Sequence, residues 1–264
     1  MSSSSPSDAT GPIKTTGLHV GEPAPGVAKT DPIIVADHIT RRFGGLTAVD
    51  VDHIEIPRGA ITALIGPNGA GKTTLIDAIT GLVPATGSVT KSGVELLGKK
   101  VHKIARLGVG RTFQTASIFE QLSVLQNLDI AAGAGRSVMT MLRKRKTVSA
   151  EIEEALETIG LTAGRDKPAG ILAHGQKQWL EIGMLLMQEP ELLLMDEPVA
   201  GMTPLETERT GELLLSLAGK HSLIVVEHDM GFVRSIAKRV TVLHEGRVLA
   251  EGDMDSVQND PQVV

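Results

Sequence analysis

Residues 66–73 carry the spacing G-x-x-x-x-G-K-[ST], which is typical of a loop that binds phosphate. The loop stands between a short apolar run rich in β-branched residues, Ile61–Ile65, and a segment of helical character that begins at Thr73. Glycines allow positive φ, so successive backbone N–H groups can turn toward phosphate oxygens, and a helix N-terminus adds partial positive charge. Strand, loop and helix together predict a nucleotide site rather than a chance glycine-rich turn.

The side chains of this loop have separate predicted roles. Lys72 can bridge the β- and γ-phosphates, and the Thr73 hydroxyl can hold Mg²⁺. The residues predicted to bind the nucleotide here are Gly66, Pro67, Asn68, Gly69, Ala70, Gly71, Lys72, Thr73 and Thr74.

Two acids, Asp196 and Glu197, end an apolar run at residues 192–195. A buried strand would deliver Asp196 rigidly to the metal, and Glu197 at the carboxyl end of that strand can polarise an attacking water. Taken alone, the segment could also be a strand followed by a charged turn. The phosphate-binding loop upstream favours the catalytic interpretation.

Three more side chains stand where they could reach the same nucleotide. The amide of Gln114 can contact Mg²⁺ and the water. His228 follows an apolar strand and can reach the γ-phosphate. Phe43 follows the first strand and can stack on adenine, worth about 1 kcal/mol. Taken singly, each has a structural alternative, as a surface glutamine, a structural histidine and a core phenylalanine.

A second glycine-containing loop, L-A-H-G-Q-K-Q at residues 172–178, precedes the acid-tipped strand. Its candidate functional residues are Leu172, Ala173, His174, Gly175 and Gln176. With this loop, six motifs stand in the order found in the ATP-binding-cassette ATPases, and from about Pro32 to its end the chain resembles that family. The resemblance implies ATP and Mg²⁺ as ligands.

Three stretches, at residues 174–183, 196–203 and 221–230, make the chain similar to the branched-amino-acid and amide type of cassette, and more closely to the ATP-binding subunits of bacterial urea transporters. This resemblance implies an ATPase that energises uptake of urea or a short amide. The alternatives are an ATPase of a branched-chain amino acid importer, and a soluble ATPase switch outside transport. Such switches usually carry two cassettes or long coiled insertions, and this chain has neither.

The resemblance also implies partners. Two cassettes, from a second ATPase subunit or a second copy of this chain, pair head to tail, so that residues 172–176 act on the partner's ATP. Two membrane-spanning permeases hold the pair on the cytoplasmic face of the bacterial inner membrane, and a periplasmic binding protein acts indirectly. A permease coupling helix would enter the groove near Gln114.

Several residues depart from the family pattern. Ala173 replaces a serine whose hydrogen bond to a charged phosphate would contribute about 1.5–3 kcal/mol at the partner's site. His174 replaces a glycine, and Thr203 stands where many cassettes carry aspartate. A weakly active, mainly structural subunit is therefore a third hypothesis, against which the intact Lys72 and Glu197 argue. The family typically continues a few residues beyond Val264.

The elements that must position these residues follow from apolar periodicity. Strands are expected at residues 32–36, 49–56, 61–65, 88–89, 94–97, 191–196, 222–227, 239–243 and 247–250. Helices are expected at residues 73–79, 124–132, 176–187 and 204–218, with another between a Ser149 cap and Gly160. Trp179 is expected to pack rather than to act on substrate.

Apolar strands that alternate with helices predict an α/β fold with a mostly parallel sheet covered on both faces. The resemblance specifies a RecA-like P-loop core, an antiparallel β-subdomain and a helical subdomain at about residues 115–187. Residues 32–264 would form one ATPase domain, after a disordered extension at residues 1–31 that is rich in Ser, Gly and Pro.

Composition excludes several classes of function. The 264 residues include no cysteine, which removes disulfides and thiolate metal sites, and the net charge of −5 with only five aromatic residues argues against nucleic acid as a partner. No apolar run approaches the roughly 18 residues that span a bilayer, so membrane association would come through a partner. The basic run at residues 143–146 is expected to be a solvated face, with anionic headgroups as the minority alternative.

Overall fold

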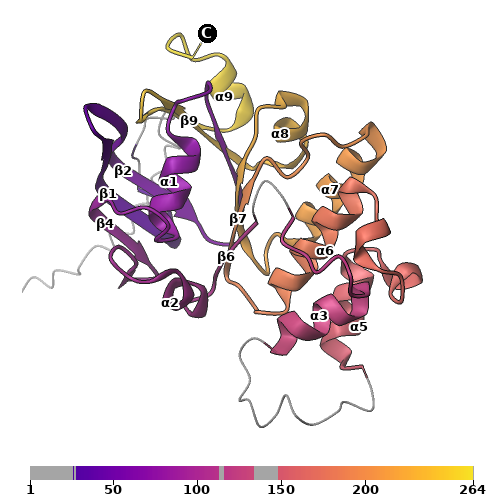
Figure 1. Cartoon of the computed structure of the whole chain (residues 1–264). Helices are drawn as coiled ribbons and strands as arrows, with labels where there is room; N and C mark the ends of the chain where they lie inside the picture. Colours follow the sequence, from indigo (N-terminus) through magenta and orange to yellow (C-terminus); the bar gives the residue numbers. More distant parts are fainter. Residues whose placement is uncertain (1–25, 27, 113–115, 134–147, 264) are drawn as a thin grey trace, which may run out of the picture.

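The computed structural model describes residues 26, 28–112, 116–133 and 148–263, and its strands form two sheets (Figure 1). The antiparallel sheet has the order β2-β1-β4-β5. Its strands are β1 (Pro32–Phe43), β2 (Leu46–Pro57), β4 (Thr86–Lys91) and β5 (Val94–Glu95). The expected antiparallel strands are confirmed, and β1 extends seven residues beyond the expected end at Ala36.

The second sheet has the order β10-β9-β3-β8-β7-β6, and only its β9–β10 hairpin is antiparallel. Its strands are β3 (Ile61–Ile65), β6 (Val109–Arg111), β7 (Leu192–Asp196), β8 (Ser222–Val226), β9 (Arg239–His244) and β10 (Arg247–Gly252). The mostly parallel sheet is therefore confirmed. Its parallel strands bring the carboxyl ends of β3, β7 and β8 to one edge.

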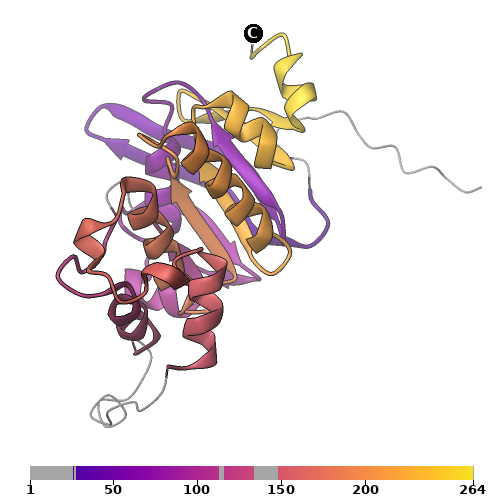
Figure 2. The ribbon, with the colours of Figure 1, turned by 90° about the vertical axis from the view of Figure 1, so that its right-hand side faces the viewer.

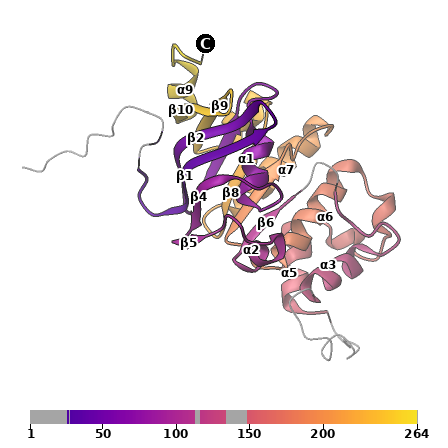
Figure 3. The ribbon, with the colours of Figure 1, turned by 60° about the vertical axis from the view of Figure 1, so that its left-hand side comes forward.

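Two groups of helices surround this sheet (Figures 1 and 2). The sheet lobe comprises both sheets with α1 (Lys72–Ile79), α2 (Val101–Arg106), α7 (Pro204–Leu217), α8 (Met230–Ile236) and α9 (Met254–Gln258). The helical lobe comprises α3 (Val124–Gly133), α5 (Ala150–Thr158) and α6 (His174–Leu186). Figure 3 shows β1, β2 and β4 on one side of the molecule and the helical lobe on the other. None of the helices that the structure describes has the length and apolar character to cross a membrane.

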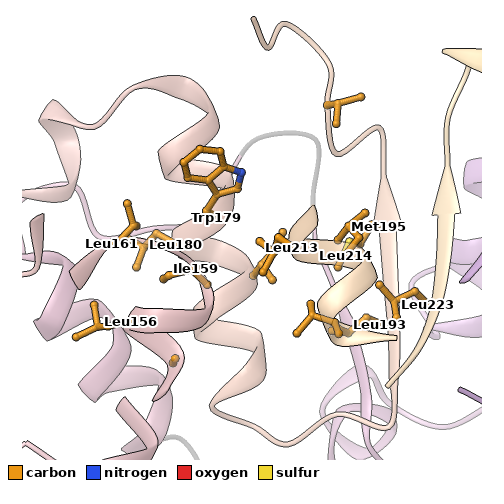
Figure 4. Close-up of a cluster of buried hydrophobic side chains, with 14 of the residues drawn as sticks. Leu156, Ile159, Leu161, Trp179, Leu180, Leu193, Met195, Leu213, Leu214 and Leu223 are labelled. Carbon is orange, nitrogen blue, oxygen red and sulfur yellow. The ribbon is translucent and has the colours of Figure 1, made fainter. Parts of the chain in front are cut away.

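Strand β7 shows why the sheet is buried on both faces. Leu192 and Leu194 point into a core shared with α1 and the antiparallel sheet, whereas Leu193 and Met195 point into a core shared with α7 and the helical lobe. All four side chains are fully buried. Figure 4 shows the second core, in which α7 residues lie between the helical lobe and the sheet.

Some local predictions were wrong. The short helices α2, α8 and α9 were not expected, and α6 begins at His174, two residues before its expected start. Ser149 occupies the N-cap of α5, but its side chain makes no capping hydrogen bond. Order also begins before Pro32, since the Lys29 ammonium forms a buried ion pair with Glu251 of β10 at 3.0 Å.

Candidate active site

The phosphate-binding loop connects β3 to α1, as the sequence predicted. Gly66 has φ +145°, and a Cβ there would lie 2.1 Å from the backbone oxygen of Leu243, so only glycine fits. Residues 67–69 form an exposed tip. The backbone of the loop thus leads into the N-terminus of α1, where N–H groups lack partners within the helix.

The Lys72 side chain folds back over this loop. Its ammonium donates to the backbone oxygens of Gly66 at 2.7 Å and Pro67 at 3.0 Å. Burial lowers the pKa of Lys72, while the nearby carboxylates of Glu197 and Asp196 act in the opposite direction. The ammonium therefore lies between the loop and the two acids that end β7.

Asp196 lies at the carboxyl end of β7 and is almost completely buried. Burial raises the pKa of its carboxyl group, against a hydrogen bond from Thr73 and the charge of Arg111. The Arg111 guanidinium lies 3.8 Å from Asp196 Oδ2. Among the described residues, Oδ1 has no hydrogen-bond partner.

This donor set fits Mg²⁺. A free carboxylate oxygen next to a threonine hydroxyl supplies hard oxygen ligands, and Mg²⁺ commonly uses one or two protein ligands together with substrate phosphates. The described residues include no cluster of three or more His, Asp or Glu side chains able to hold a metal by themselves.

Glu197 follows Asp196 in a left-handed conformation with φ +52°, which non-glycine residues seldom adopt. Its backbone N–H donates to the oxygen of Val226 at 2.9 Å, which ties the turn to the neighbouring strand β8. Its Oε1 lies 3.7 Å from Nδ1 of His228, at the end of β8. The segments that follow β7 and β8 thus bring a carboxylate and an imidazole close together.

Glu227, which the sequence reasoning missed, organises the same edge. Its carboxylate is buried and accepts the backbone N–H groups of Val199 at 3.1 Å and His228 at 3.2 Å. Burial raises the pKa of Glu227, and these hydrogen bonds act against that rise. An acid directly after a continuous apolar strand, the signal used for Asp196, could have identified it.

Arg111 was also missed as a connecting residue. From the end of β6, its guanidinium pairs with Asp77 and donates to Thr80 Oγ1 at 3.2 Å, so it joins α1 to the Asp196 carboxylate. Arg111 comes three residues before Gln114. Gln114 and residues 143–146 lie outside the described residues.

Phe43 is the last residue of β1 rather than part of a loop, and it is 46% exposed. The guanidinium carbon of Arg41 lies 4.3 Å from the centroid of its ring. The exposure disagrees with the core-packing alternative, and Arg41 covers one face of the ring.

The 172–176 loop lies apart from these groups, at the start of α6 in the helical lobe. Leu172 is buried, Ala173 and His174 are exposed, and Gln176 Oε1 accepts the Ala173 backbone N–H at 3.1 Å. Within the part of the chain that the structure describes, no hydrogen bond joins this loop to residues 66–74. The loop thus starts a helix of the helical lobe, whereas residues 66–74 connect β3 to α1 in the sheet lobe.

Comparison with known proteins gives one consistent family. The family model described as "ABC transporter" matches residues 49–200. The branched-chain amino acid transport ATP-binding protein BraF of Pseudomonas aeruginosa is 36% identical over 245 residues, which cover 88% of this chain and 96% of that protein. The corresponding LivG protein of Escherichia coli K12 is 35% identical over 247 residues, with coverage of 89% and 97%.

Solved structures agree. An ATP-binding cassette of an ABC transporter in its ADP conformation has a TM-score of 0.77 and 32% identity, and the match covers 89% of this chain and 97% of that chain. A nucleotide-free cassette has a TM-score of 0.76 and 31% identity, with coverage of 88% and 97%. These matches confirm the predicted cassette fold.

Proposed function

This chain belongs to the ABC transporter family of ATP-binding proteins, and we propose that it is the ATP-hydrolysing subunit of an importer for branched-chain amino acids. Membership of the family makes it an ATPase of the kind that transporters use. The observation that supports the substrate is similarity over almost the full length of relatives named for branched-chain amino acid transport. The sequence resemblance favoured urea or a short amide as the transported solute, but the relatives found are named for branched-chain amino acids.

Hydrolysis at this site would depend mostly on positioning and charge. The backbone of residues 66–74 and the Lys72 ammonium would bind the phosphates, and Phe43 would stack on adenine. Thr73, Asp196 and Gln114 would hold Mg²⁺. When bound, Mg²⁺ supplies positive charge to the phosphate oxygens.

Glu197 and His228 would act at the γ-phosphate. The Glu197 carboxylate would orient the attacking water and accept its proton, and the His228 imidazole would contact the γ-phosphate. The 3.7 Å between Glu197 Oε1 and His228 Nδ1 supports a shared target. The left-handed turn at Glu197 supports a catalytic role, because such strain clusters at functional sites.

The arrangement of the two loops favours a head-to-tail pair of cassettes. The loop of residues 172–176, which starts α6 in the helical lobe, would bind the partner's ATP, while residues 66–74 of the sheet lobe bind the chain's own ATP. The second cassette would be another copy of this chain or a related subunit. Two permeases would hold the pair at the cytoplasmic face of the inner membrane, and a periplasmic binding protein would deliver the solute.

A groove of about 790 Å³ between the lobes offers a place for a permease segment. Residues of β4 and β5, α2, the end of α3 and the α6–β7 connection line it, among them Val94, His102, Ala131 and Met187. Val94 is 44% exposed there. The exposed Val94 would offer an apolar contact to a short helix from a partner, in a groove that many polar side chains also line.

The substrate assignment can be tested with the assembled transporter in vesicles, by measuring phosphate release with the binding protein present. We expect leucine to raise the ATPase rate and urea to leave it at the basal value. Stimulation by urea alone would contradict the assignment and favour the urea-type alternative. Copurification with ribosomes instead of permeases would favour a soluble switch.

A further inference from the structure

Helices α6 and α7 belong to different lobes, yet two contacts, each between a pair of residues, join them. The two contacts are one helical turn apart along each helix. The first pair is Gly175 with Glu206, and the second is Trp179 with Thr210. In each helix the two positions are four residues apart, so they lie on one face. The contact therefore has a fixed register.

Glu206 makes the first connection with its carboxylate. Oε2 accepts the backbone N–H of Thr203 at 3.0 Å and its hydroxyl at 2.8 Å, which caps α7. The start of α6 lies against this carboxylate, since the Gly175 backbone N–H also contributes to the lowered pKa of Glu206. These hydrogen bonds, those from Thr203 first, lower the pKa of Glu206, so the carboxylate is ionised at neutral pH.

The first connection leaves little room for a side chain at position 175. A Cβ on Gly175 would lie 2.8 Å from Glu206 Oε1 and 3.0 Å from its Cδ. A side chain at 175 would therefore push Glu206 away from the start of α6.

Trp179 makes the second connection. Its indole Nε1–H donates to Thr210 Oγ1 at 2.8 Å, and the Thr210 hydroxyl donates to the backbone oxygen of Glu206 at 2.8 Å. Both side chains are buried, and Figure 4 shows Trp179 within the core that joins the lobes. Trp179 therefore packs in the core, as expected, and also donates a directed hydrogen bond.

His174 adds a third contact to the same turn. Its Nε2 lies 3.1 Å from the backbone oxygen of Ala200, in the segment between Glu197 and α7. The first residues of α6 are thus held by the segment that follows Glu197.

We propose that Glu206 and Thr210 are positioning residues, which hold the 172–176 loop in a fixed orientation to residues 197–203 and so place the surface offered to the partner's ATP. This inference rests on the proposed head-to-tail arrangement. Both residues belong to α7 and lie outside the residues proposed to bind the chain's own nucleotide. Loss of either should therefore lower turnover in the assembled transporter without changing how the isolated chain binds ATP.

The test compares Glu206→Ala with Glu206→Gln and with Glu208→Ala, which removes the same charge from an exposed position of α7. We expect Glu206→Ala to lower kcat of the assembled transporter about tenfold, while the affinity of the isolated chain for a fluorescent ATP analogue stays within twofold. Glu206→Gln retains a carbonyl acceptor and should recover most of the rate. Glu208→Ala should match wild type.

Trp179 is the only tryptophan in the chain, so its fluorescence reports on the second connection directly. Thr210→Val keeps the shape of the side chain but removes the hydroxyl, and we expect a shift in the emission maximum together with a lower kcat. A double-mutant cycle of Gly175→Ala and Glu206→Ala should be less than additive in thermal stability, because the shorter side chain at 206 makes room for the new methyl.

The outcomes separate the two proposals. Failure of wild type to hydrolyse ATP in the assembled transporter would refute the proposed function, while the fluorescence and stability cycle would still test the contact. Wild-type kcat in Glu206→Ala and Thr210→Val, in a transporter that hydrolyses ATP, would overturn the positioning role. An additive cycle would overturn the contact itself.

Discussion

At the residue scale, the buried carboxylate of Asp196, which we propose as a Mg²⁺ ligand, lowers the stability of the folded chain. Burial raises its pKa above the usual value of 3.8, so folding disfavours the ionised form. As pH falls from the raised pKa of the folded chain toward the pKa of Asp196 in the unfolded chain, the folded chain protonates Asp196 first and so gains stability. As pH rises through the same window, that gain is lost.

Asp196→Asn should therefore have opposite effects on stability and activity. At pH 7 we expect a higher melting temperature for the nucleotide-free chain, because the unfavourable charge is gone, and the difference should shrink below about pH 4. The ATPase rate should fall by at least about a hundredfold, since the metal supplies several kcal/mol of charge stabilisation. Calorimetry at pH 7 and below about pH 4 checks the predicted change in stability. A melting temperature of Asp196→Asn below that of wild type at pH 7 would contradict the prediction.

Ala173 also affects the stability of α6, which the sequence did not reveal. The structure places Ala173 at the N-cap of α6, where its side chain makes no capping hydrogen bond. Ala173→Ser should add a capping hydrogen bond and raise the free energy of unfolding by about 1 kcal/mol. Urea unfolding should show a higher midpoint at unchanged slope. Ala150→Ser, at the exposed first residue of α5, is the control and should change stability by less than about 0.5 kcal/mol. Equal stability of Ala173→Ser and wild type would disprove the cap.

At the element scale, residues before β1 fasten the antiparallel sheet to the terminal hairpin. The Lys29–Glu251 pair has side-chain exposures of only 5% and 1%, and Glu251 also accepts hydrogen bonds from Gly26 N and Thr241 Oγ1. Removal of one partner would leave a charge buried without compensation. A segment expected to be disordered therefore contributes to the fold.

Lys29→Met should lower the free energy of unfolding by about 3 kcal/mol. The control is Lys220→Met, whose pair with Glu154 has exposures of 77% and 72% and should contribute less than about 1 kcal/mol. Urea unfolding of both variants measures the two losses in free energy of unfolding. Equal, small losses in the two variants would show that the N-terminal pair is dispensable.

The sequence predicted the elements that carry motifs but not the contacts between them. Strands β3, β7 and β8 were predictable because each is a continuous apolar run. The helices α2, α8 and α9 have five to seven residues, which is too few for a 3.6-residue period to be visible. Gly175 and Glu206 are 31 residues apart, and no local pattern connects them.

The same limit applies to the candidate site. Lys72, Asp196, Glu197 and His228 could be found from motifs, since each follows a recognisable loop or strand. The same signal marks Glu227 as an acid at the end of a strand, but no motif shows its role, which depends on the backbone N–H groups that reach its buried carboxylate.

At the scale of the whole molecule, the two lobes separate the chain's own nucleotide site from the loop that would serve a partner. The groove between the lobes lies beside the α6–β7 connection, so a permease seated there would contact both lobes. Movement of one lobe relative to the other could then carry the nucleotide state to the membrane.

Val94→Glu should disrupt this docking, because it places a charge where an apolar contact is proposed. We expect at least a tenfold loss of copurified permeases, with ATP-analogue binding unchanged. Leu215→Glu, at an exposed apolar residue of α7 outside the groove, is the matched control. Normal assembly of the Val94 variant would place the permease elsewhere.

The measurement that tests the central claim most directly is phosphate release from MgATP by wild type and Glu197→Gln in the assembled transporter. The amide keeps the shape of the side chain but cannot accept the proton of water. We predict a loss of at least about a hundredfold in rate, with ATP-analogue binding retained. A wild-type rate of phosphate release in Glu197→Gln would contradict the account.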